Sequence, residues 1–286
     1  MAEVPHIFDR KARAQRQARA LKIPGQSFLV LEAAAGAAER AGAANRRFHN
    51  ALELGSADTA FDLMKPLADT WARSVFAENE VLDLPPESFD LAVSVLALHA
   101  VNDLPGALIQ IRRTLKPDGL FVGALYAGDT LRELRESFAA GEEEISGGAS
   151  PRVTPFADVR DLGGLLQRAG FNLPVADTER TTVRYRQFDT LVSDLRAAAE
   201  TNALASRAKG PLRRDVLAAS LAHYKVNHAE DDGRLRATFD IVYLTGWTPH
   251  ESQQKPLRPG SAKKRLADAL GTLEQNAGDS VPVKRG

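Results

Sequence analysis

The chain has 286 residues, 44% of them hydrophobic and 26% charged, so it is long enough to bury a sizeable core. Its 37 basic residues balance 37 acidic ones, which leaves no overall field to recruit nucleic acid or an anionic membrane. Cysteine is absent, which excludes disulfides, thiolate nucleophiles, iron–sulfur clusters and cysteine-ligated zinc.

Two helical stretches are predicted first, over residues 9–21 and 27–43, the second rich in alanine with apolar residues three and four positions apart. The apolar run at 51–54 then predicts a short buried strand that ends at Gly55. Residues 61–76 are predicted as a helix interrupted at Pro66.

The middle of the chain contains the clearest strands. Residues 89–95 are mostly apolar, as expected for a parallel strand covered on both faces, and 120–126 form a second run of this kind. Between them, 103–115 carry a helical stripe of leucine and isoleucine that stops at the turn 116–119. This order predicts a right-handed βαβ unit in a parallel sheet.

The second half continues the alternation with longer insertions. Helices are predicted at 128–140, 159–169, 188–202 and 213–226, and strands at 174–177, 181–185 and 237–244, the first two as a pair. Residues 142–150, acidic and then rich in glycine, are a candidate lid. From 249 onward the composition predicts a partly disordered tail in which only 262–270 can form a helix.

A ligand of such a sheet binds beyond the carboxyl ends of the strands, which selects three places. The first is the turn of small residues after Glu53, and the second is Glu78 with Asn79. The third begins at Leu98 and His99, directly after the strand 89–95. No apolar run approaches the roughly 20 residues of a membrane span and no secretory signal opens the chain, so we expect a cytoplasmic protein without an integral membrane segment.

Three motifs of the chain are particular: Leu98-His99-Ala100-Val101-Asn102-Asp103, Gly128-Asp129-Thr130-Leu131 and His250-Glu251-Ser252. With them the chain resembles the S-adenosylmethionine (SAM)-dependent methyltransferase-like family related to mitochondrial complex I assembly factors, with biotin-pathway methyltransferases more distant. The resemblance runs from about residue 7 to about 262.

The resemblance implies an α/β, Rossmann-like class I methyltransferase fold with a mostly parallel sheet, N-terminal helices and a helical insertion. The spacing from Glu53 to Glu78 implies one βα unit fewer than usual. The expected organisation is an N-terminal helical flank at 1–48, a methyltransferase-like domain at 49–248 and a tail at 249–286.

The resemblance also implies SAM as cofactor. The residues that match its binding loops are Glu53, Gly55, Ser56, Ala57, Glu78, Asn79, Leu98 and His99. Ala57 and Thr59 stand where the family has its second and third glycines, and Asp69 or Glu78 could take the place of the missing ribose carboxylate.

Structural roles remain open for several of these residues. Glu53 could cap the following helix instead of contacting a ligand, and His99 has no metal partner and could be a structural or pocket-lining residue. Asp129 could cap the helix that it opens. No catalytic residue and no metal ligand are assigned.

Two functions follow from these observations. The first is a SAM-dependent methyltransferase or SAM-using modifying enzyme acting on a protein, with a respiratory-complex subunit as one candidate, in line with the arginine hydroxylation associated with the mitochondrial relatives. Such catalysis works by proximity and orientation and needs few acid–base residues. The second is a non-catalytic assembly factor that kept the fold and lost SAM. Nucleic acid is not an expected partner.

Overall fold

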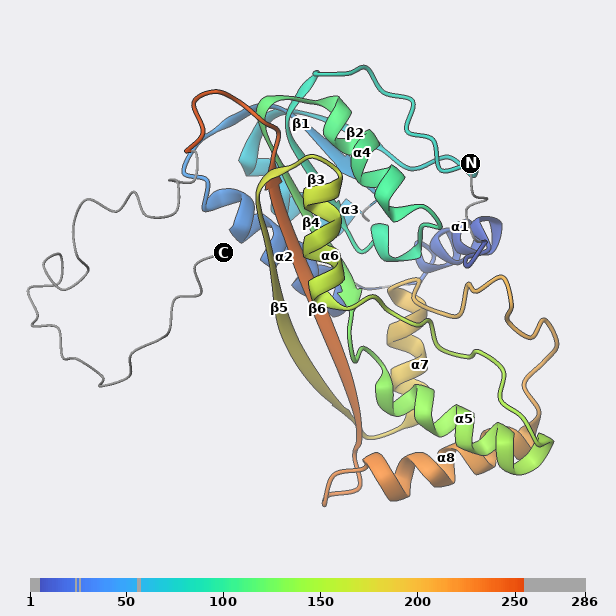
Figure 1. Cartoon of the computed structure of the whole chain (residues 1–286). Coiled ribbons are helices and arrows are strands. Elements are labelled where there is room, and N and C mark those ends of the chain that lie inside the picture. Colours follow the sequence, from blue (N-terminus) through green and yellow to red (C-terminus); the bar gives the residue numbers. More distant parts are fainter. Residues whose placement is uncertain (1–5, 24, 26, 56–57, 255–286) are drawn as a thin grey trace, which may run out of the picture. The chain divides into compact units, whose positions relative to one another are not determined.

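A mixed sheet of six strands organises the described part of the chain, which in this computed structural model comprises residues 6–23, 25, 27–55 and 58–254. The strands are ordered β2-β1-β3-β4-β6-β5 (Figure 1). Their bounds are β1 Phe48–Leu54, β2 Ala68–Ser74, β3 Phe89–Val95, β4 Leu115–Ala127, β5 Asn172–Tyr185 and β6 Leu235–Trp247. Only β6 runs against its neighbours. The mostly parallel Rossmann-like sheet is therefore confirmed.

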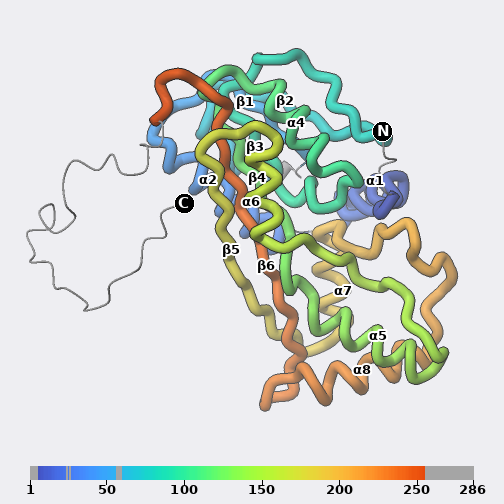
Figure 2. Tube along the Cα trace, in the orientation of Figure 1, coloured from blue at the N-terminus to red at the C-terminus, as the bar shows by residue number. Residues whose placement is uncertain are grey.

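Helices cover both faces of the sheet, as Figures 1 and 2 show. One hydrophobic cluster joins α4 and α6 to one face, and another joins α2 and α3, with α5, α7 and α8 farther along, to the other. The segment between β5 and β6 holds α7 and α8, which are the expected helical insertion. The bounds are α1 Arg10–Ala20, α2 Phe28–Gly42, α3 Asp58–Met64, α4 Leu104–Thr114, α5 Arg132–Ser146, α6 Val159–Arg168, α7 Phe188–Ala197 and α8 Arg214–His228.

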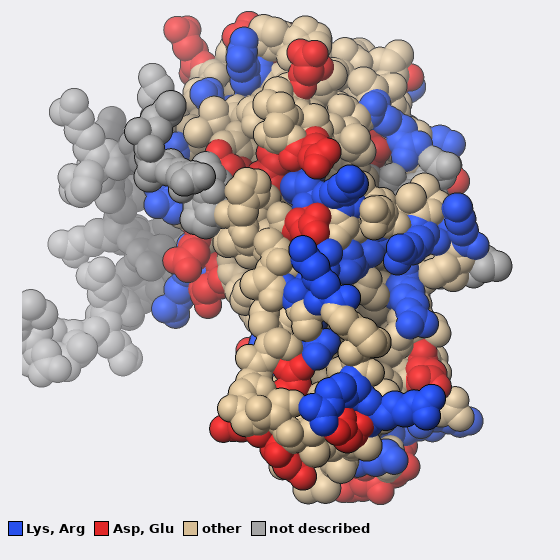
Figure 3. All heavy atoms as spheres, turned by 90° about the vertical axis from the view of Figure 1, so that its right-hand side faces the viewer, with Lys and Arg blue, Asp and Glu red and all other residues tan. Residues whose placement is uncertain are grey.

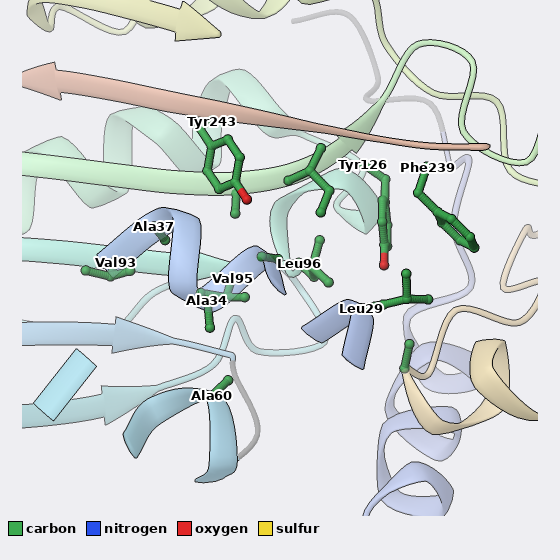
Figure 4. Packing of buried hydrophobic residues seen from close by; sticks show 14 of the residues in the cluster. Leu29, Ala34, Ala37, Ala60, Val93, Val95, Leu96, Tyr126, Phe239 and Tyr243 are labelled. Carbon is green, nitrogen blue, oxygen red and sulfur yellow. The ribbon is translucent and has the colours of Figure 1, made fainter. Parts of the chain in front are cut away.

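Helix α2 lies close against the sheet because its buried face is made of alanine and glycine. Ala34 and Ala37 are fully buried and face the strands (Figure 4). At Gly36 the ring of Tyr243 from β6 occupies the place of a side chain, and the guanidinium of Arg40 lies 3.6 Å from the centroid of that ring. The small residues of this helix thus set how closely it approaches the sheet.

We expect Gly36→Ala to destabilise the fold although alanine favours helices. An added Cβ would lie 2.2 Å from the hydroxyl oxygen of Tyr243, and such overpacking costs about 1–3 kcal/mol. In the same helix a Cβ at Gly42 would meet its nearest atom, in Leu67, only at 4.0 Å, so Gly42→Ala should be neutral or stabilising. Chemical denaturation of both variants checks this, and equal stabilities would contradict it.

The helix predicted over 61–76 is wrong in its second half. Helix α3 ends at Met64, a short 3₁₀ turn (Lys65–Leu67) contains Pro66, and β2 follows as an edge strand. The strand was missed because most of its residues are exposed or half-buried, so no apolar run marks it. Residues 75–88 then cross to β3 without a helix, as expected for a sheet that is one βα unit short.

The two short strands predicted at 174–177 and 181–185 are one strand. β5 pairs with β6 from Asn172 opposite Trp247 to Tyr185 opposite Leu235. Polar residues separate the two predicted strands in the sequence. One of them, Arg180, forms an ion pair with the buried Asp240 of β6, with Nε 2.6 Å from Oδ1.

The candidate lid at 142–150 is also corrected. Helix α5 continues to Ser146, and Glu142 within it is buried. Its carboxylate accepts hydrogen bonds from the Nε of Arg152 (2.8 Å) and the hydroxyl of Ser150 (2.7 Å). Burial alone would raise the pKa of Glu142, but these hydrogen bonds lower it. The two ends of the segment are thus joined to each other. The helix predicted at 262–270 lies outside the described residues.

Candidate functional site

The ends of β1 and β3 meet helix α1 around a cavity of about 220 Å³, which we call the strand-end cavity. Its walls include Arg13, Leu54, Gly55, Phe76, Glu78 and Ala97. This is the edge of a parallel sheet at which ligands bind in such folds. The volume is below the roughly 300–1,000 Å³ of typical small-ligand pockets.

Gly55 suits close approach of a ligand to the backbone. Its φ of +82° lies in the left-handed region, and its amide donates to the carbonyl of Ser74 at 3.1 Å. A Cβ at this position would lie 2.9 Å from the Cβ of Ala97. This tight glycine turn at the cavity fits the SAM site implied by the sequence. Ser56 and Ala57 lie outside the described residues.

The loop between β2 and β3 places one acidic residue at the cavity. Glu78 is exposed and lines it, whereas Asn79 is exposed and accepts a hydrogen bond from the amide of Val81 at 3.3 Å. The next residue, Glu80, accepts hydrogen bonds from the amides of Asn102 (2.7 Å) and Asp103 (2.9 Å). Glu80 thus fastens this loop to the segment after β3.

Glu53 and Asp69 do not line the strand-end cavity. Glu53 is buried and pairs with the Nε of Arg73 on β2 at 3.0 Å, so this carboxylate fastens the edge strand to β1. Asp69 lies near the amino end of β2, where it pairs with Arg47 and with His49. A ligand site lies at the carboxyl ends of the strands, and Asp69 lies at the opposite end. The prediction that Asp69 replaces the ribose carboxylate is therefore wrong.

Leu98 and His99 stand on the 3₁₀ turn Leu98–Ala100 after β3, and neither lines the strand-end cavity. Leu98 is buried in the hydrophobic cluster of α4. The side chain of His99 is 4% exposed, with Nε2 3.0 Å from the Oε2 of Glu200 and its ring beside that of Tyr126, centroids 5.2 Å apart. His99 thus faces a buried carboxylate, away from the predicted cofactor loop.

Glu200 joins His99 to Arg13 in a buried ion cluster. The Nη2 of Arg13 lies 2.7 Å from the Oε1 of Glu200 and donates to the carbonyl of Leu96 at 3.1 Å. Burial alone would raise the pKa of Glu200, but Arg13 and His99 bring the pKa down to about 2, so the carboxylate is ionised at neutral pH.

A second cavity of about 480 Å³, the aromatic cavity, lies on the other side of this cluster. Its apolar walls include Tyr126, Phe138, Phe156, Phe188 and Phe239, and Glu200 contributes the buried charge. Because Arg13 lines the strand-end cavity and Glu200 lines the aromatic cavity, one ion pair forms part of the wall of both.

Tyr126 brings an unpaired polar atom to the aromatic cavity. It lies at the carboxyl end of β4 beside Phe239 (Figure 4), and its residue is 2% exposed. Among the described residues its hydroxyl has no hydrogen-bond partner. Burial, and then the charge of Glu200, raise the pKa of Tyr126 well above its usual value, so the hydroxyl stays protonated and can donate.

The Gly128-Asp129-Thr130-Leu131 motif connects the end of β4 to β6. The hydroxyl of Thr130 accepts from the amide of Asp240 at 2.9 Å, and Thr130 and Leu131 line the aromatic cavity. Asp129 does not cap α5, since the residue preceding that helix is Leu131; its carboxylate instead pairs with Arg180 at 2.9 Å.

Sequence reasoning missed Tyr126 on the wall of the aromatic cavity and the Arg13–Glu200 pair between the two cavities. Tyr126 ends the predicted strand 120–126, so the rule that selects residues at strand ends could have found it. No local signal marks Arg13 and Glu200, which are 187 positions apart in the sequence.

Comparisons with known proteins agree with this architecture. A family model described as a methyltransferase domain matches residues 16–123. The human protein described as arginine-hydroxylase NDUFAF5, mitochondrial, is 40% identical over 281 residues, covering 90% of this chain and 81% of its own length. The zebrafish (Danio rerio) protein of the same description is 43% identical over 211 residues, covering 73% of this chain and 65% of its own length.

A more distant match has a different description. The malonyl-[acyl-carrier protein] O-methyltransferase of Gallionella capsiferriformans is 35% identical over 175 residues, covering 61% of this chain and 58% of its own length. The match to the human protein covers most of both chains. This chain therefore belongs to the family of the arginine-hydroxylase NDUFAF5 proteins and carries a methyltransferase domain.

Proposed function

We propose that this protein is a SAM-using enzyme that modifies a side chain of a protein substrate, with arginine, named in the description of its relatives, as the first candidate. The observation that carries the proposal is the buried Arg13–Glu200 pair between the two cavities. A cofactor on one side of this pair and a substrate side chain on the other would be neighbours. We further propose, from the resemblance, a respiratory-complex subunit as the substrate.

The strand-end cavity is the proposed place of the cofactor. The backbone at Gly55 would lie against its amino-acid part, and the carboxylate of Glu78 would accept hydrogen bonds from its polar groups. When bound, SAM supplies an electrophilic methyl carbon. The protein's own contribution is to hold two reactants in register and to keep water out.

The aromatic cavity is the proposed place of the substrate side chain. Its rings offer faces to the flat guanidinium of an arginine, and the ionised Glu200 favours a cation close by. The hydroxyl of Tyr126 is free to hydrogen-bond to a group that enters the cavity. Arg152 and Arg196 also line the cavity, so the proposal for a long, flat side chain rests on the rings and on the Tyr126 hydroxyl.

Titration with SAM by calorimetry is the first test. We expect wild-type protein to bind SAM, and Glu78→Gln to bind about ten- to a hundredfold more weakly, the usual loss when a hydrogen bond to a charged group is removed. Glu144→Gln is the control, because Glu144 is exposed on α5 and makes the same change of charge away from the cavity. No binding to wild type at millimolar SAM would overturn the proposal and leave the non-catalytic assembly factor.

Two expectations from the sequence stay predictions. No helix in the part of the chain that the structure describes is both long and apolar enough to cross a membrane. The cytoplasmic location remains to be tested by fractionation, since the descriptions of the relatives place those proteins in mitochondria. The division at residues 48 and 248 likewise remains a proposal.

A further inference from the structure

An open groove of about 510 Å³, which we call the basic groove, adjoins the aromatic cavity. Phe138, Arg152, Thr201 and Asn202 line both, so the groove leads directly to the cavity. Its remaining walls are Arg16 of α1 and the segment Arg207, Ala208 and Lys209. A chain that runs along this groove can therefore place a side chain in the aromatic cavity.

The groove is positively charged. Four of its lining residues are basic, and no acidic side chain lines it in the described part of the chain. Arg152 pairs with Glu142, and Arg207 pairs with Asp9 at 2.9 Å. Burial, and then the nearby cations Arg207 and Arg19, lower the pKa of Arg16, as expected where positive charges crowd together.

Two cations of the groove remain available to a partner. Arg16 donates only to the carbonyl of Ala12 in its own helix, and neither Arg16 nor Lys209 has an ion pair with a described residue. Figure 3 views the side of the molecule on which α1 lies in Figure 1, and Lys and Arg gather across the middle of that face. The local charge contrasts with the zero net charge of the chain.

We propose that the basic groove binds an acidic segment of the protein substrate, next to the residue that enters the aromatic cavity. This inference rests on the proposed function. A carboxylate in the groove would meet Arg16 and Lys209, and the apolar faces of Phe138 and Ala208 would contact the backbone and short side chains of the segment.

A polypeptide suits the groove better than a nucleic acid. Nucleic-acid affinity grows with the number of phosphates that basic side chains neutralise, and this groove offers two cations without an internal carboxylate partner. The adjoining cavity has a volume of about 480 Å³ and several aromatic rings in its wall, so it can hold an amino-acid side chain.

Fluorescence anisotropy with a short labelled peptide tests the proposal. The peptide has one arginine flanked by aspartate and glutamate, and a second peptide replaces the acids with glutamine and asparagine. Wild-type protein should bind the acidic peptide at least about tenfold more tightly, and added salt should reduce the difference. The double variant Arg16→Glu with Lys209→Glu should lose this preference.

The matched control is the double variant Lys116→Glu with Lys225→Glu. Both lysines are exposed and lie outside the groove, so the same change of net charge should leave peptide binding unaltered. Arg16→Gln with Lys209→Gln removes the charges without reversing them and should give an intermediate loss. Circular dichroism of each variant shows whether it is folded.

Other results would overturn the proposal. Equal binding of the acidic and neutral peptides would show that the groove does not distinguish charged from neutral peptides. A loss of peptide binding in the control variant as large as in Arg16→Glu with Lys209→Glu would show the same. Tighter binding of a single-stranded RNA probe of equal length would assign the groove to nucleic acid. SAM titration of the same samples separates the two claims, because peptide binding without SAM binding supports the groove and overturns the proposed enzyme.

Discussion

Replacing Glu200 with glutamine should lower the free energy of unfolding by about 3–5 kcal/mol, which is the usual cost of removing one partner of a buried ion pair. The amide is nearly the same size as the carboxylate, so the loss reflects charge and not volume. Arg13, whose side chain is 6% exposed, would keep its charge without a counterion. The desolvation of that guanidinium is the source of the penalty.

The remaining partners of Arg13 are too weak to replace Glu200. Its guanidinium donates to the carbonyls of Ala199 (2.9 Å) and Leu96 (3.1 Å), which are dipoles and carry no net charge. His99 loses an acceptor at the same time, because its Nε2 lies 3.0 Å from the Oε2 of Glu200. The cluster therefore fails as a unit, as coupled networks do.

The stabilisation from Glu200 should depend on pH in a defined direction. The pKa falls from 4.5 to about 2 on folding, so the stabilisation is present above pH 4.5 and is lost as the pH falls from there toward 2. A shift of this size corresponds to about 3 kcal/mol. The difference in stability between wild type and Glu200→Gln, measured by denaturant unfolding, should thus shrink across this window. A constant difference would contradict the ion-pair explanation.

A double variant separates stability from function. Arg13→Met with Glu200→Leu removes both charges and keeps the volume, so it should regain most of the lost stability. If the pair also positions cofactor and substrate, the stable double variant should still be impaired in substrate modification. Full activity in the double variant would show that the pair has a structural role only.

The sequence predicted the centre of the sheet better than its edges. β3 and β4 are apolar on both faces, and their runs at 89–95 and 120–126 were recognised. β2 is an edge strand that buries little surface, and a proline precedes it, so neither period nor composition distinguished it from the end of a helix. A buried strand can be recognised in a sequence by its apolar residues, and β2 lacks them because most of it is exposed or half-buried.

The residues of the candidate site could likewise be predicted only in part from the sequence. Placing ligand residues after the strands brought Gly55 and Glu78 to one cavity, although they come from different loops. The partner of His99 was not predictable, because Glu200 lies just after α7 in a distant helical insertion and a charged residue in a sequence suggests a surface position. Tertiary packing alone buries it beside Arg13.

Gly55→Val should abolish SAM binding, with affinity reduced at least a hundredfold. The φ of +82° at this position strains any residue with a Cβ, and for a β-branched side chain the cost is about 1–3 kcal/mol. The added atoms would also enter the strand-end cavity beside Ala97, where a Cβ already comes within 2.9 Å. Calorimetry with SAM measures the loss of affinity, and thermal unfolding measures the loss of stability caused by the backbone strain.

Gly233→Val is the matched control, because its φ of +78° strains the backbone in the same way while no heavy atom lies within 4 Å of an added Cβ there. Gly55→Ala should lie between wild type and valine, since it has the same backbone strain with fewer atoms in the cavity. SAM binding that is kept in Gly233→Val and lost in Gly55→Val separates steric exclusion from backbone strain, because both positions have a positive φ. If the folded Gly55→Val protein bound SAM like wild type, the cofactor would have to lie elsewhere, and the strand-end cavity would lose its proposed role.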